Sequence, residues 1–141
     1  MGIFLDSSIL IHAERKQRTV LQLLEDIRVR FGDVEIGLSV ISIAELVHGA
    51  YRAKTESQSF KRLAFIDRIC KRLPVHPFTI QLARTLGRIE GQQAAQGNVL
   101  AFEDLAIGVT ALHLGFDVVT LNRKHFDRIP GLGVIGDFSS S

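Results

Sequence analysis

Short apolar runs that alternate with longer amphipathic stretches constrain the fold of this chain more than any other feature of its sequence. The apolar runs lie near residues 3–5, 36–40, 117–122 and 131–135, and each is predicted to contain a short buried strand. Strands that alternate with helices form parallel sheets, which bury both faces under helices. We therefore predict an α/β fold with one parallel β-sheet flanked by helices on both faces.

The helices are predicted from apolar residues at helical spacing and from signals at their ends. Over residues 20–31, for example, Leu21, Leu24, Ile27 and Phe31 recur on one face. Five further helices and one helical turn are expected around 9–12, 43–53, 59–73, 79–96, 101–115 and 123–129. One of the two serines that follow Asp6 is expected to cap the first helix.

One domain is expected, because 141 residues is close to the commonest domain size. We place this domain at residues 1–138 and expect a frayed tail at 139–141. The single cysteine, Cys70, excludes an internal disulfide and fits a reducing compartment. Neither a signal peptide nor a run long enough to cross a bilayer is apparent in the sequence. We therefore expect a cytoplasmic protein with no membrane partner.

The net charge of +2 and the isoelectric point near 9.0 permit a polyanionic partner but do not establish one. A functional site must therefore be sought in particular residues. In open parallel sheets, such sites form beyond the carboxyl ends of the strands. Oxygen-bearing side chains stand at four strand-to-helix positions that can converge there: Asp6, Glu45, Asp104 and Asn122.

Each of these residues also has a purely structural explanation. Asp6 and Asn122 can cap the helix or turn that follows them. Ser42 and Glu45 have the spacing of a capping box, and Asp104 can complement the dipole of its helix. Asp104 is the hardest to explain in this way, since its helix is otherwise strongly apolar and an unpaired buried carboxylate is costly. Together, three acids and an amide suit a hard divalent ion such as Mg²⁺ or Mn²⁺.

Three blocks of the sequence resemble the PIN-domain ribonucleases, and more narrowly the VapC-type toxins of type II toxin–antitoxin pairs. "FLDSSILI" resembles the family's opening strand with its first acid, Asp6. "SVISIAELVHGA" resembles the second block, with Ser42 and Glu45. "EDLAIGVTALHLGFDVVTLNRKHFDRIPGLGVI" resembles the C-terminal block, with Asp104 and Asn122. The order of the blocks, and their spread over nearly the whole chain, makes the resemblance specific.

The resemblance implies a PIN-like fold and a metal-dependent endoribonuclease, the toxin of a pair, that hydrolyses phosphodiester bonds in single-stranded or loop regions of RNA. It implies that Asp6, Glu45 and Asp104 hold Mg²⁺ or Mn²⁺ and that Asn122 assists. It also implies a homodimer and a cognate antitoxin that blocks the active site. We further expect Ser42 to hold one of the acids in place.

Two departures from the family pattern bear on these expectations. The fourth position of the site is often an acid, but here the neutral Asn122 lowers the charge of the site. Glu103 adds a carboxylate beside Asp104, and because neighbours on a helix point about 100° apart, Glu103 is expected to face away. Asn122 keeps open a second interpretation, in which the chain is a catalytically weak module that binds RNA or an antitoxin.

Basic residues near the expected site are candidates for contacts with the RNA backbone. Three follow the first predicted helix and two follow Asn122: Arg15, Lys16, Arg18, Arg123 and Lys124. Plain solvation of the surface is the alternative for each of them. Apolar residues between Gly49 and Ile69 suggest a groove for an antitoxin segment or a dimer face, and internal packing is the alternative there.

Overall fold

A computed structural model describes residues 1–136 of the chain, so the predicted boundary at 138 and the predicted tail at 139–141 lie outside the described residues. The chain folds around a five-stranded sheet in which all neighbouring strands are parallel. The strand order is β3-β2-β1-β4-β5. The strands are β1 (Gly2–Leu5), β2 (Glu35–Ser39), β3 (Val75–His76), β4 (Phe116–Val119) and β5 (Val134–Ile135).

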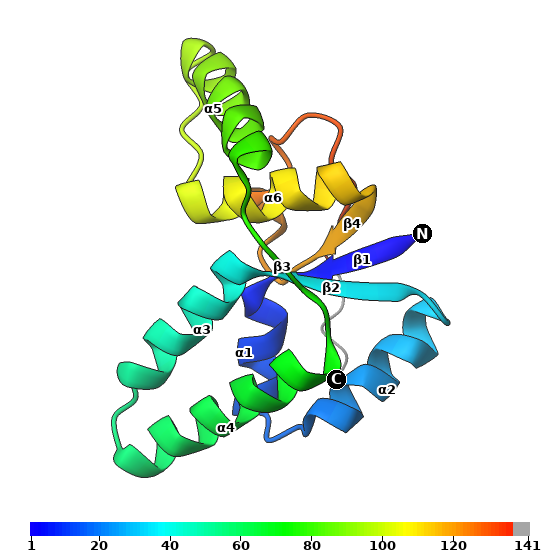
Figure 1. Ribbon diagram of the computed structural model, residues 1–141, viewed down its shortest axis with the longest axis vertical. Coiled ribbons are helices and arrows are strands. Elements are labelled where there is room, and N and C mark those ends of the chain that lie inside the picture. Colours follow the sequence, from blue (N-terminus) through cyan, green and yellow to red (C-terminus); the bar gives the residue numbers. More distant parts are fainter. Residues whose placement is uncertain (137–141) are drawn as a thin grey trace.

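Helices cover both faces of this sheet (Figure 1). On one face lie α1 (Ser7–Arg15), α2 (Val20–Phe31), α3 (Val40–Tyr51) and α4 (Glu56–Arg72), and on the other lie α5 (Ile80–Ala95) and α6 (Phe102–Leu114). The predicted α/β fold, a parallel sheet between two helical layers, is therefore confirmed. Within residues 1–136, no helix has both the length and the apolar character needed to cross a lipid bilayer.

The central strand β1 separates two hydrophobic clusters. Ile3 and Leu5 pack into the cluster beneath α1–α4, whereas Phe4 packs into the cluster beneath α5 and α6. This alternation follows from the pleat of a strand, in which successive side chains point to opposite faces. Because both faces of the strand are covered, the run that precedes Asp6 is continuously apolar.

Side-chain caps set the starts of α2 and α3. α2 has the predicted bounds, because Thr19 and Gln22 form a capping box in which each side chain bonds the backbone N–H of the other. α3 begins three residues earlier than predicted, because Ser39 caps it and accepts a backbone N–H bond at 3.0 Å. Ser42 therefore lies inside the helix, and the alternative in which Ser42 and Glu45 form a capping box is wrong.

The carboxyl ends of β1 and β4 meet at one edge of the sheet. Asp6, and not one of the two serines, occupies the N-cap position of α1, so the predicted serine cap is wrong. The side chain of Asp6 makes no capping bond. The backbone N–H of Asp6 donates to the carbonyl oxygen of Val119 at 3.0 Å, which extends the pairing of the two strands. Because β4 ends at Val119, three residues before Asn122, Thr120 is the residue that stands beside Asp6.

Candidate active site

Hydroxyl groups hold Asp6 at the carboxyl end of the central strand. Asp6 is 5% exposed, and its Oδ2 accepts hydrogen bonds from Ser8 Oγ at 2.7 Å and Thr120 Oγ1 at 2.8 Å. Ser8 Oγ accepts a bond from the backbone N–H of Leu121 at 3.0 Å, and Thr120 Oγ1 accepts one from that of Asn122 at 2.9 Å. Backbone amides thus orient two hydroxyls, and these hydroxyls orient the carboxylate.

Glu45 approaches the same edge of the sheet from α3. Ser7 Oγ donates to Glu45 Oε1 at 3.1 Å, which links the start of α1 to the second turn of α3. Burial raises the pKa of Glu45 to about 7, the bond from Ser7 opposes this rise, and repulsion by Asp6, Asp104 and Glu103 adds to it. The three principal acids predicted from the sequence therefore interact electrostatically in one place.

Asp104 reaches the site from the first turn of α6. Its side chain is 17% exposed, and its Oδ2 lies 3.4 Å from Nδ1 of His125. Burial raises the pKa of Asp104; His125 counteracts this rise, whereas Asp6 and Glu103 add to it. His125, in the segment after β4, therefore offsets part of the cost of burying the Asp104 carboxylate. The spacing of the histidines in the sequence did not suggest this contact.

A cleft of ≈ 510 Å³ opens beside Asp104. Its lining includes the basic side chains of Lys124, His125 and Arg128, together with the short apolar segment 99–101. The volume lies within the roughly 300–1,000 Å³ of typical ligand-binding sites. Asp104 therefore borders a cleft that has room for a ligand carrying negative charge.

Comparison with known proteins identifies the family. Residues 3–132 match the PIN domain. The chain belongs to the PIN-domain family. It is 33% identical to Ribonuclease VapC1 of Rickettsia felis over 135 residues, which cover 96% of each chain. It is 31% identical to the tRNA(fMet)-specific endonuclease VapC of Salmonella typhimurium over 78% of this chain and 83% of that protein. The predicted resemblance to VapC proteins is confirmed.

A solved structure agrees with the fold of this PIN domain. In the crystal structure of VapBC2 from Rickettsia felis bound to a DNA fragment from their promoter, one chain superposes with a TM-score of 0.80. The sequence identity is 25%, and the match covers 96% of this chain and 98% of that one. Both the sheet and the helices that position the acids therefore have a counterpart of known structure.

Two of the predicted site residues behave differently in this PIN domain from the three acids. Asn122 has an exposed side chain that makes no capping bond, and its backbone N–H bonds to Thr120 instead. Ser42 is fully buried, and its Oγ has no hydrogen-bond partner among the described residues. Ser42 thus does not hold an acid by a hydrogen bond; Ser7 does so for Glu45.

The hydroxyls that hold the acids were missed in the sequence, although a signal for them exists. Ser7 and Ser8 directly follow Asp6 in "LDSS", and Thr120 follows the last strand residue in "VVTLN". A hydroxyl next to the end of a parallel strand is placed at the same edge as an acid that ends the neighbouring strand. The register of β1 against β4, which brings these positions together, is visible only in the structure.

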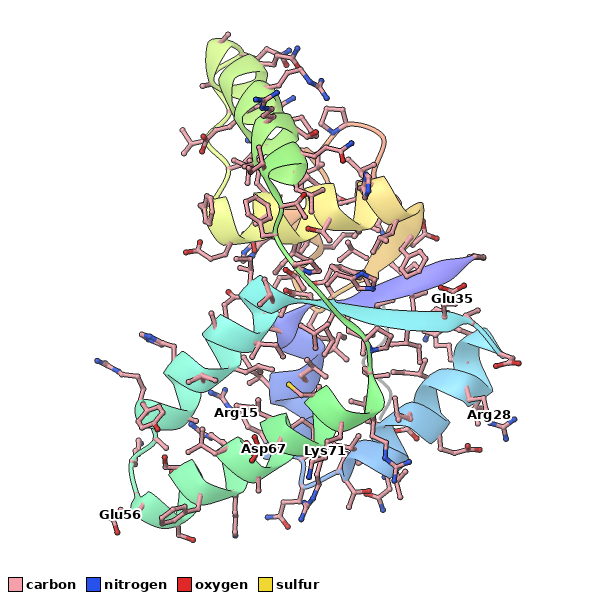
Figure 2. The ribbon with its side chains drawn as sticks, in the orientation of Figure 1. Arg15, Arg28, Glu35, Glu56, Asp67 and Lys71 are labelled. Carbon is pink, nitrogen blue, oxygen red and sulfur yellow. The ribbon has the colours of Figure 1, made fainter. Side chains whose placement is uncertain are left out.

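The basic residues predicted after the first helix lie away from the acids. Arg15, Lys16 and Arg18 follow or end α1, a helix of nine residues, which spans about 14 Å from its start beside Asp6. Figure 2 shows Arg15 between α3 and α4. Arg15 lines a groove that shares no residue with the cleft beside Asp104. Arg18 is paired with Asp26 at 2.6 Å.

The basic residues after Asn122 lie closer to the acids. Lys124 lines the cleft beside Asp104. Arg123 is not among the residues that line it, and its Nε lies 3.2 Å from Oδ1 of Asp127. Arg128, which the sequence analysis did not single out, does line the cleft.

The donors of this PIN domain fit a hydrated divalent ion. They are carboxylate oxygens, which Mg²⁺ and Mn²⁺ prefer. Burial, with added repulsion between the acids, raises the pKa of Glu45 and Asp104, and a cation would favour their charged forms. Within residues 1–136, no three acidic, histidine or cysteine side chains form a compact metal-binding cluster. Mg²⁺ usually keeps several water molecules and takes only one or two carboxylates, so an open arrangement of acids suits it.

Proposed function

We propose that this PIN domain is a metal-dependent endoribonuclease, the toxin of a toxin–antitoxin pair, that cuts single-stranded or loop regions of RNA in the cytoplasm. The observation that carries the proposal is the electrostatic coupling of Asp6, Glu45 and Asp104, which come from distant parts of the chain. The names of its VapC relatives, a ribonuclease and a tRNA(fMet)-specific endonuclease, support the same reaction.

The acids would share the task of holding Mg²⁺ or Mn²⁺. Asp6 and Asp104 are the proposed direct ligands, and Glu45 is either a third ligand or the group that orients the attacking water. A bound divalent ion would lower the pKa of a water molecule and offset negative charge on the phosphate. Ser8 and Thr120 hold the Asp6 carboxylate in one orientation, so that it needs little rearrangement to bind.

The raised pKa of Glu45 suits this residue to a second proposed task, the acceptance of a proton. A group that accepts a proton from water works best when its pKa is near the working pH, and burial raises the pKa of Glu45 to about 7. Ser7 fixes one carboxylate oxygen of Glu45 by donating to it at 3.1 Å. Asn122 completes the proposed site by binding a phosphate oxygen or a water through its exposed amide.

A protein partner is the second part of the proposal. A small groove of ≈ 50 Å³ lies between α1, α3 and α4. Its lining is mainly apolar and also includes the charged residues Glu14, Arg15 and Arg62. The groove includes part of the region from Gly49 to Ile69 for which the sequence suggested a docking surface. An amphipathic segment of the cognate antitoxin would place its apolar side chains there. We also propose that the chain forms a homodimer, which light scattering during size-exclusion chromatography would detect.

Cleavage of total cellular RNA by the purified, antitoxin-free protein tests the reaction. With Mg²⁺ or Mn²⁺ we expect discrete fragments, which disappear in EDTA and in the Asp104→Asn variant. Asp67→Asn, which removes an exposed acid on α4 far from the site (Figure 2), should cut like the wild type. A folded protein that cuts no RNA with either ion would instead favour the alternative, a module that binds RNA or an antitoxin.

A further inference from the structure

We propose that the cleft beside Asp104 binds the strand of RNA on one side of the bond that is cut, with Lys124 and Arg128 on its phosphates and the segment 99–101 against a base. This subsite rests on the proposed ribonuclease function and adds to it the path of the substrate. In this proposal the contacts with RNA phosphates lie in the cleft beside Asp104, and not at the C-terminal end of α1, where the sequence suggested some of them.

The charges around the cleft favour a polyanion. Lys124, His125 and Arg128 line it, and the acids that line it are Asp104 and Asp127. Asp127 is paired with Arg123 at 3.2 Å, which offsets its charge. Asp104 belongs to the proposed metal site. The cleft therefore places a group of basic side chains beside Asp104.

Arg128 is held in place by a chain of hydrogen bonds from α5. Its guanidinium donates to Asn98 Oδ1 at 3.1 Å. Asn98 in turn donates through Nδ2 to Oε1 of the buried Gln93 at 2.9 Å and through its backbone N–H to the carbonyl oxygen of Gln93 at 2.8 Å. A guanidinium has five N–H donors, so Arg128 keeps donors for a phosphate while Asn98 restricts its position. Asn98 is thus a positioning residue.

The segment 99–101 supplies an apolar surface in the same cleft. Val99 is 91% exposed, whereas Leu100 is partly buried and packs against the hydrophobic cluster beneath α5 and α6. Leu100 thereby anchors the segment and leaves Val99 in solvent. Sites for single-stranded nucleic acid combine basic groups that follow the backbone with side chains on which bases stack, commonly aromatic ones. In the proposed subsite, the aliphatic side chain of Val99 would supply the contact with a nucleobase. A duplex, whose bases are stacked inside, cannot offer a base to this segment.

The salt dependence of RNA binding tests the phosphate contacts. We would measure the fluorescence anisotropy of a short labelled oligouridylate over a range of KCl concentrations, in EDTA so that no RNA is cut. Each phosphate contact to a single strand contributes about 0.7 to the slope of log K against log salt. The Lys124→Ala/Arg128→Ala variant should therefore bind more weakly, with a slope reduced by about 1.4.

Two further variants make the test specific. Arg28→Ala removes an exposed basic side chain from the outer side of α2, remote from the cleft (Figure 2). This variant should leave the salt slope of RNA binding unchanged. Val99→Ser should weaken the binding of single strands without changing the slope, because an apolar contact releases no counterions. Thermal melts of each variant would establish that it is folded.

A double-mutant cycle tests the role of Asn98. Asn98→Ala should weaken binding in the wild-type background, because Arg128 loses its support. In the Arg128→Ala background, the same change should have no further effect. Equal effects in both backgrounds would show that Asn98 does not act through Arg128.

The results separate the subsite from the proposed reaction. A wild-type slope in the Lys124→Ala/Arg128→Ala variant would overturn the subsite, even if the protein cuts RNA with Mg²⁺. Conversely, if the wild type cuts no RNA but this variant loses slope as expected, the subsite stands as an RNA-binding surface and the ribonuclease proposal fails.

Discussion

Asp6 and Asp104 are proposed to hold the same ion, yet the two acids differ in burial and in the groups that contact them. Asp6 follows the central strand, is almost completely buried, and accepts bonds from two hydroxyls that are themselves fixed by backbone amides. Asp104 lies on the first turn of a helix at the edge of a cleft, and its contact is an exposed histidine ring 3.4 Å away.

The difference suggests how a metal site could combine one acid of fixed orientation with one acid whose orientation adjusts. An acid built into a sheet keeps one orientation, because moving it would break bonds that belong to the fold. An acid on the edge of a cleft can adjust its rotamer as an ion and a phosphate arrive. In the proposed site, Asp6 would therefore set the position of the ion, and Asp104 would adjust to the ion and the substrate.

The largest expected effect is common to both acids. Asp6→Asn and Asp104→Asn each remove a proposed ligand and should lower ribonuclease activity by more than the roughly 10–100-fold that is typical of groups that only support a ligand. Circular dichroism should show an unchanged fold. Cleavage of RNA at the normal rate by either variant would remove that residue from the site.

A smaller effect is expected when the support of Asp6 is removed. Thr120→Val keeps the shape of a buried side chain but removes the hydroxyl that donates to Asp6, and should lower activity and metal affinity by roughly 10–100-fold. Thr110→Val is the matched control, because that buried hydroxyl donates to the carbonyl oxygen of Ala106 within its own helix, α6. If both variants lose activity equally, orientation of Asp6 by Thr120 is not needed.

The two acids should also differ in what they contribute to folding. Asp6→Ala leaves the hydroxyls of Ser8 and Thr120 without their carboxylate and should lower the free energy of unfolding by about 1–3 kcal/mol. Asp104→Ala removes a carboxylate whose charged form is disfavoured by burial, and should not destabilise the protein. Urea unfolding in EDTA measures both. Equal destabilisation would contradict the contrast between a fixed and an adjustable acid.

The last effect concerns Glu45 and pH. Its pKa is about 7 in the folded protein and 4.5 for an ordinary glutamate, so the folded state holds this proton more tightly than the unfolded state. In EDTA, Glu45 therefore contributes no penalty below about pH 4.5, and stability falls as the pH rises from there through about 7. Glu45→Gln should remove this fall and melt at a higher temperature than the wild type above pH 7.

The control for this comparison is Glu35→Gln, which changes an exposed glutamate at the start of β2 (Figure 2). Its melting temperature should follow the wild type across the whole pH range. If the Glu45→Gln variant also follows the wild type, the pKa of Glu45 is not raised in the metal-free protein.

The sequence predicted the layers of the fold because each rests on a local pattern. The bounds of α2 follow from one face of apolar residues and from a capping box contained in four residues. The start of α3 was misplaced because both Ser39 and Ser42 are acceptable caps, and only the length of β2 decides between them. Competition between two local signals is resolved by tertiary structure.

The candidate site divides in the same way. Asp6, Glu45 and Asp104 were predicted because acids are conspicuous beside buried apolar runs. The hydroxyls stand beside the ends of strands in the sequence, but the bonds from Thr120 to Asp6 and from Ser7 to Glu45 join residues far apart in the chain, and only the structure shows which of them pair. His125 and Arg128 were missed for a similar reason, since their position depends on how the segment after β4 folds back over α6.

The parallel sheet order has a consequence for synthesis on the ribosome, where the chain emerges from its N-terminus and its N-terminal part folds first. The groove proposed for the antitoxin uses residues only from α1, α3 and α4, all made before residue 73. The proposed ribonuclease site needs Asp104 and Thr120, and Thr120 follows Asp6 by 114 residues. A nascent chain would therefore carry the proposed surface for its inhibitor well before it could assemble the proposed active site.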